Sequence, residues 1–131
     1  MLEIHDEHSD KLLHRDITEA VIGAAFEVHQ ELGYGFLERV YQRALRVELI
    51  RRGVVAEIER RIQVQYKGVV VGDYDADLIV ADSVAVEIKV NPQYDKRDEV
   101  QLLNELKAAG LKVGLLINFG RNKVEYKRLV F

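Results

Sequence analysis

The spacing of apolar residues changes three times along the chain, and these changes constrain the fold more than any other feature. Three segments place apolar side chains three and four positions apart, which predicts amphipathic helices: residues 17–32, 37–52 and 97–109. Six other runs are short, rich in β-branched residues and bounded by turn residues, which predicts strands: residues 62–66, 69–71, 76–80, 84–90, 113–117 and 124–130. This order, with the first strands as an antiparallel meander, predicts an α/β fold in which helices pack on a mixed sheet.

The N-terminal region lacks an apolar stripe that would anchor it. We therefore expect residues 1–14 to be a flexible segment and residues 15–131 to form a single domain. His5 and His8 have a spacing that could hold a metal on a helix, although a frayed terminus is the favoured interpretation. Asp16 is expected to cap the first helix, with Glu19 in the capping-box position.

Composition limits the classes of function. The 131 residues include no cysteine, which excludes disulfides and thiolate metal sites. The net charge of −3 counts against a dedicated nucleic-acid binder, although a basic groove can occur on an acidic protein. The chain starts without a signal-peptide pattern and has no apolar run near the roughly 20 residues that span a bilayer. We expect a cytoplasmic protein that does not associate with membranes.

Two carboxylates and a lysine are expected to meet on one face of the sheet. If residues 81–83 form a three-residue turn and the flanking strands pair, Asp77 lies directly opposite Glu87. Such partners have Cβ atoms about 4.5–5.5 Å apart and point to the same face. Lys89 is two positions beyond Glu87 and shares that face. A two-residue turn would instead place Asp77 and Glu87 on opposite faces.

This cluster is costly unless a cation binds it. Two carboxylates about 5 Å apart repel by roughly 3 kcal/mol at an effective dielectric near 20. Mg²⁺ or Mn²⁺ reverses the sign, because these ions prefer oxygen ligands. Alternatively, Lys89 simply neutralises Glu87 while Asp77 turns to solvent, and the residues alone leave both interpretations open.

Two motifs resemble a known family. Asp77, followed by Glu87, Ile88 and Lys89, resembles the D…ExK signature of the PD-(D/E)XK phosphodiesterase superfamily. The more specific match is residues 35–41, which resemble the GxxExxY motif of a family of small bacterial and archaeal proteins within that superfamily. Residues 28–33 and 110–120 agree with this family, so the resemblance covers essentially residues 17–131.

The resemblance implies a restriction-endonuclease-like core, with a mixed central β-sheet flanked by helices. It implies that Asp77 and Glu87 bind Mg²⁺ or Mn²⁺ and that Lys89, Glu38 and Gln101 serve catalysis. Glu105 departs from the family, which commonly has tyrosine there. Because Glu105 lies four residues from Gln101 on the same helical face, it adds negative charge near a presumed phosphate path.

We therefore expect a metal-dependent phosphodiesterase that hydrolyses DNA or RNA through metal-activated water, with DNA favoured over RNA as partner. The alternative is a catalytically inactive nuclease-fold module that binds nucleic acid or a protein. A homodimer is a further open alternative.

Two polar residues on the first helices have structural interpretations. His29 flanks the buried face of the first helix, which favours a hydrogen-bonded structural histidine over a ligand. Glu48 lies near the apolar stripe of the second helix, where it could form an ion pair with an arginine.

Overall fold

The structure, a computed structural model, describes residues 13–131. The interpretation of His5 and His8, and nearly all of the expected flexible segment, lie outside the described residues. The elements follow one another as α2 (Arg15–Leu32), α3 (Glu38–Arg51), β1 (Ala56–Tyr66), β2 (Val69–Val80), β3 (Val84–Lys89), a 3₁₀ turn (Lys96–Asp98), α4 (Glu99–Ala109), β4 (Val113–Phe119) and β5 (Val124–Val130).

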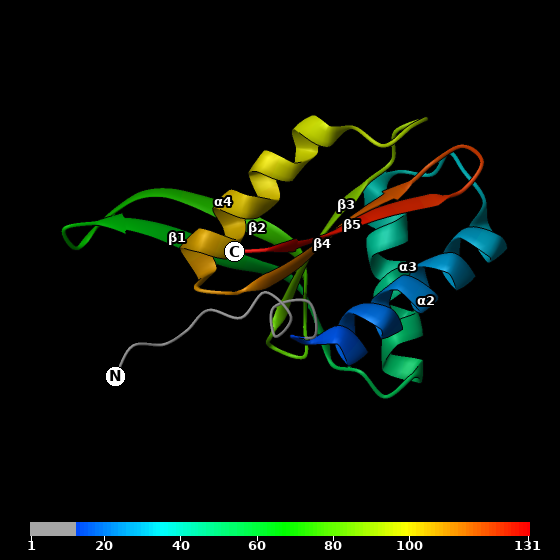
Figure 1. Cartoon of the computed structure of the whole chain (residues 1–131), viewed down its shortest axis with the longest axis horizontal. Coiled ribbons are helices and arrows are strands. Elements are labelled where there is room, and N and C mark those ends of the chain that lie inside the picture. Colours follow the sequence, from blue (N-terminus) through cyan, green and yellow to red (C-terminus); the bar gives the residue numbers. More distant parts are fainter. Residues whose placement is uncertain (1–12) are drawn as a thin grey trace.

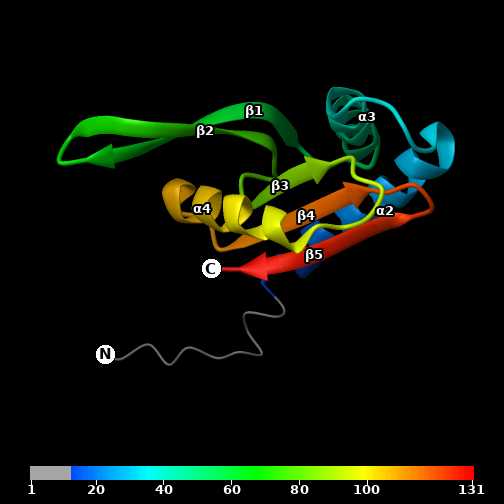
Figure 2. The ribbon, with the colours of Figure 1, turned by 90° about the horizontal axis from the view of Figure 1, so that it is seen from above.

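The five strands form one sheet in the order β1-β2-β3-β4-β5. Strands β3 and β4 are parallel, and the other neighbours are antiparallel. The parallel pair requires a crossover connection, and α4 supplies it. Helix α4 covers one face of the sheet, while α2 and α3 cover the other (Figures 1 and 2). The predicted mixed sheet flanked by helices is confirmed.

Helices on both faces give the sheet two apolar layers, and β3 contributes to both. Val84, Val86 and Ile88 face the core beneath α2 and α3. Ala85 belongs to the core beneath α4. Because side chains alternate along a strand, Glu87 and Lys89 lie on the α4 face.

Strands β1 and β2 form a long ribbon that extends beyond the body of the molecule (Figure 2). The two runs predicted at residues 69–71 and 76–80 belong to one strand of 12 residues. The ladder is interrupted between Ile58–Leu78 and Arg60–Ala76, where Glu59 has a positive φ of 56°. This break changes the alternation of β2, because Leu78 packs beneath α2 and α3 whereas Ala76 packs beneath α4.

The predicted cap of the first helix is wrong. Helix α2 begins at Arg15, so Asp16 lies inside its first turn rather than at the cap. Asp16 still has a favourable position, because the helix dipole stabilises acidic residues there. Glu19 forms an ion pair with Arg15 at 2.9 Å instead of a capping box.

Among residues 13–131, no helix combines the length and the apolar character that crossing a bilayer requires.

Candidate active site

The hairpin between β2 and β3 has the predicted register. Val80 pairs with Val84, Ile79 with Ala85, and Leu78 with Val86. Beyond the last of these pairs, the Asp77 side chain enters the space between the strands, and its Oδ2 accepts a hydrogen bond of 2.7 Å from the Ile88 amide.

Asp77 and Glu87 come together at the end of this hairpin. The two carboxyl groups lie close enough that Asp77 acts electrostatically on Glu87. The alternative in which Asp77 turns to solvent is therefore wrong, as is the two-residue turn that would separate the two side chains.

Lys89 joins this pair from the next position on the same face of β3. Its Nζ lies 3.9 Å from Oε1 of Glu87, and its side chain is 20% exposed. Such a loose, mostly buried ion pair offsets only part of the negative charge, because a second and a third carboxylate lie close by. Lys89 is thus the ammonium group that the sheet brings to the cluster.

Helix α4 contributes the third carboxylate, Glu105, which is fully buried. Nε2 of Gln101 donates to Oε1 of Glu105 at 3.2 Å and to Oε1 of Glu87 at 3.3 Å. The Glu105 carboxyl also acts electrostatically on that of Glu87. The sequence placed Glu105 beside Gln101 on α4 but not against Glu87. The available signal was its position between Leu102 and Leu106, which mark the buried face of the helix.

Helix α3, which covers the face of the sheet opposite α4, also approaches the cluster. Glu38, the first residue of α3, is exposed and interacts electrostatically with Lys89 and Asp77. One turn later, the buried Gln42 donates from Nε2 to the backbone oxygen of Asp77 at 3.0 Å. Gln42 ties α3 to the strand that carries Asp77, and sequence reasoning missed it because a lone glutamine on a helix carries no signal.

The tyrosine of the GxxExxY stretch has a structural role. The Tyr41 hydroxyl donates to the Gly33 carbonyl at 2.6 Å and accepts from the Phe36 amide at 3.3 Å. Its buried ring stacks on Phe119 with centroids 4.5 Å apart. These contacts hold the loop before α3 and so position the start of the helix, where Glu38 lies.

The structural interpretations of His29 and Glu48 are confirmed. Nε2 of His29 is hydrogen bonded to the Gly120 carbonyl at 2.8 Å, which links α2 to the turn after β4. Glu48 accepts a hydrogen bond of 2.9 Å from Nε of Arg52. Neither residue belongs to the carboxylate cluster.

Burial makes the cluster hold protons strongly. Burial, and then repulsion from Asp77 and Glu105, raise the pKa of Glu87 to about 10. Burial also raises the pKa of Asp77, against the opposing effect of the hydrogen bond from Ile88, and raises the pKa of Glu105. Partial burial raises the pKa of Glu38. Without a cation, ionisation of all these groups together is unfavourable.

The chemistry of the donor set fits a hard divalent cation. Oε2 of Glu87 and Oε2 of Glu105 are buried, and no nitrogen or hydroxyl of the described chain donates to either. Buried carboxylate oxygens without donors are costly, and a cation that prefers oxygen ligands would satisfy them. No three His, Asp or Glu side chains in residues 13–131 form a ready-made cage, so binding requires these carboxylates to adjust.

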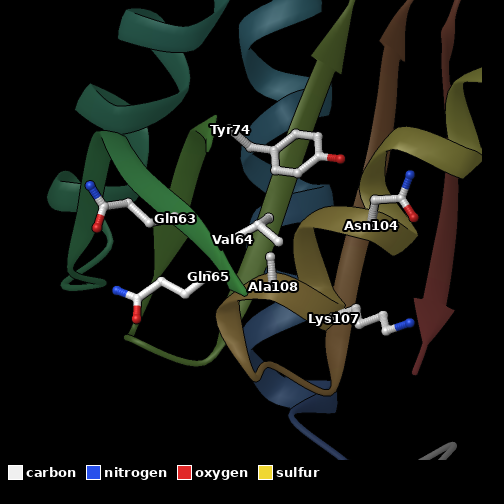
Figure 3. Close-up of a pocket in the computed structure, with 7 residues that line it drawn as sticks. All are labelled: Gln63, Val64, Gln65, Tyr74, Asn104, Lys107 and Ala108. Atoms are coloured by element: carbon white, nitrogen blue, oxygen red, sulfur yellow. The ribbon is translucent and has the colours of Figure 1, made fainter. Parts of the chain in front are cut away.

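A hollow of about 450 Å³ lies nearby, between the ribbon and α4. Tyr74, Asn104 and Lys107 are among its lining residues (Figure 3). Gln63 and Gln65 also line it, but their amide groups point away from α4 in Figure 3. The hollow shares no side chain with the carboxylate cluster and is not part of the candidate site.

Comparisons with known proteins concern the family and the fold of the chain. The family model of the PD-(D/E)XK nuclease superfamily matches residues 15–129. No curated protein matches the chain. Among solved structures, the protein SSO0001 is 17% identical with a TM-score of 0.53, and the match covers 98% of this chain and 69% of that one. An alkaline exonuclease, LHK-Exo from Laribacter hongkongensis, is 13% identical with a TM-score of 0.44, covering 98% and 72% of the two chains.

Proposed function

The chain belongs to the PD-(D/E)XK nuclease superfamily, and from this premise we propose that it is a metal-dependent phosphodiesterase that hydrolyses DNA or RNA. The observation that carries the proposal is that Asp77 accepts a hydrogen bond from the Ile88 amide, while Glu87 and Lys89 flank Ile88 on the same strand and form an ion pair. The predicted restriction-endonuclease-like fold is confirmed. The narrower GxxExxY resemblance and the preference for DNA stay predictions.

Asp77 and Glu87 are the residues that would hold Mg²⁺ or Mn²⁺. When bound, such an ion polarises a phosphoryl oxygen and lowers the pKa of water. Gln101 supports the arrangement by donating to Glu87, and Gln42 supports it by holding the backbone of Asp77.

Lys89 and Glu38 supply the remaining chemistry. The Lys89 ammonium stabilises negative charge that develops on the phosphate and helps to orient the attacking water. Glu38 has a raised pKa and interacts with Lys89 from the start of α3. The raised pKa makes Glu38 a better proton acceptor than an ordinary glutamate, and its exposure lets it release the proton to solvent.

The test is cleavage by the purified full chain with Mg²⁺ or Mn²⁺, on single- and double-stranded DNA and RNA. We expect Lys89→Ala to reduce the rate by about 10²–10³-fold, the usual loss when one charge-stabilising donor is removed. Circular dichroism and thermal unfolding show whether the variant folds. Lys112→Ala is the matched control. Lys112 is exposed and precedes β4 at the end where Val113 pairs with Val84, whereas Lys89 lies at the opposite end of β3.

The proposal fails if the wild type and Lys89→Ala are equally inert on every substrate. The net charge of −3 then favours the second candidate, a catalytically inactive nuclease-fold module. That module would bind nucleic acid with an affinity that falls as salt rises, because phosphate contacts release counterions, and it would not cut.

A further inference from the structure

Glu105 is a buried acid that the proposed catalytic steps do not use. Its side chain is fully buried on the sheet-facing side of α4, between Leu102 and Leu106. Burying a carboxylate costs several kcal/mol unless it is neutralised or paired with a cation. No arginine, lysine or histidine of the described chain forms an ion pair with it. Its place in the core therefore needs a physical reason.

We propose that Glu105 is a third carboxylate ligand of the cation that Asp77 and Glu87 bind. This inference rests on the proposed function and deepens it, because it makes the site a tricarboxylate. A hard divalent cation such as Mn²⁺ or Mg²⁺ is the ligand that such a set of oxygens takes.

The unpaired oxygens support this assignment. Gln101 satisfies Oε1 of Glu105 and Oε1 of Glu87 with the same amide nitrogen, at 3.2 and 3.3 Å. Oε2 of each carboxyl is buried and receives no hydrogen bond from a nitrogen or hydroxyl within residues 13–131. A purely structural buried acid would have donors for both oxygens. Here each carboxyl keeps one oxygen available, and the two carboxyls interact electrostatically.

The position of the Gln101 amide indicates how a cation would fit. The partial positive charge of its nitrogen lies between two anionic oxygens from different elements, one on β3 and one on α4. It therefore marks a place where positive charge is favourable between Glu87 and Glu105. Gln101 is an exposed residue, so its side chain can withdraw toward solvent when an ion takes up this role.

The charge balance of the cluster also supports Glu105 as a third ligand. When ionised, Asp77, Glu87 and Glu105 carry three negative charges, and Lys89 supplies one positive charge. The sum is −2, which one divalent cation neutralises. Glu38 and Glu59 also act electrostatically on Asp77 or Lys89, but both are exposed and solvated. With Glu105 left out, the ion would leave a net positive charge in a largely buried place.

Calorimetric titration of the full chain with Mn²⁺ tests the assignment without any reliance on cleavage. We expect Glu105→Gln to weaken Mn²⁺ binding by about 10- to 100-fold, as is typical for residues that support a metal site. Thermal unfolding with and without Mn²⁺ gives a second readout, and the stabilisation by Mn²⁺ should shrink in the variant. Asp75→Asn is the control, because it removes one exposed negative charge from the same strand as Asp77 and should change the affinity less than about threefold.

Two further outcomes separate this inference from the proposed function. If Glu105→Gln binds Mn²⁺ like the wild type while Asp77→Asn does not bind it, the Glu105 assignment is overturned and the proposed function stands. If the wild type itself does not bind Mn²⁺, both are overturned. Glu105→Asp, which keeps the charge but shortens the side chain, should weaken binding as well. Unchanged affinity in Glu105→Asp together with a loss in Glu105→Gln would overturn direct ligation, because only the charge of Glu105 would then matter.

Discussion

The raised pKa of Glu87 predicts an unusual pH dependence of stability for the metal-free protein. The folded protein holds this proton up to about pH 10, whereas an exposed glutamate releases it near 4.5. Between these values, unfolding releases a proton, so the free energy of unfolding falls as pH rises. The contribution of Glu87 to stability is complete below pH 4.5 and is lost progressively toward pH 10.

The magnitude of this pH dependence follows from the release of one proton on unfolding. A single proton changes the free energy of unfolding by at most roughly 1.4 kcal/mol per pH unit. Between pH 6 and pH 8 the wild type should therefore lose roughly 2–3 kcal/mol through Glu87. Glu87→Gln has no proton to release, so its stability should depend less on pH by that amount. Glu19→Gln is the control, because Glu19 is an exposed carboxylate on α2.

Urea denaturation in EDTA at pH 6, 7 and 8 measures this difference. The wild type and Glu87→Gln should approach each other in stability at the acid end and diverge at pH 8, with the variant more stable. Adding Mn²⁺ should reverse the trend in the wild type, because a cation displaces the proton and binds better as pH rises. Parallel pH profiles for the two proteins in EDTA would refute the reasoning that Glu87 is protonated in the fold.

Two other variants test the elements that position the site. Tyr41→Phe leaves the Gly33 carbonyl and the Phe36 amide without the hydroxyl. We expect a loss of about 1–2 kcal/mol in urea unfolding, whereas an unchanged midpoint would argue against a structural role. Glu59→Gly relieves the positive φ of 56° at the break in the ribbon. It should raise the unfolding free energy by up to about 1 kcal/mol, since the relief of roughly 1–2 kcal/mol is partly offset by the flexibility of glycine when unfolded. A clear loss of stability would show that the Glu59 side chain makes a contact of its own.

Local patterns predicted much of the fold. The helical spacing over residues 17–32 predicted α2 to within two residues, because an amphipathic stripe and a following glycine can both be recognised in the sequence. The almost wholly apolar run at residues 113–117 predicted a strand, and β4 is buried throughout. The turn at residues 81–83 set the register that brings Asp77 and Glu87 together. Each of these features depends on neighbours that are close in the sequence.

Contacts between distant segments were not predictable in the same way. Gln42 binds the backbone of a residue 35 positions away, and only the family resemblance indicated that Gln101 reaches the site of Glu87, 14 positions away. The break at Glu59 changes the alternation of side chains between the two faces of β2 beside Asp77. No glycine in the sequence indicates this break. The chain by itself therefore determined its secondary structure, its hairpin register and two carboxylates of the cluster, since these follow from periodicity and turn length. Only the packing of α4 against β3 decided that Glu105 is the third, because burial and charge proximity depend on which helix covers which face of the sheet.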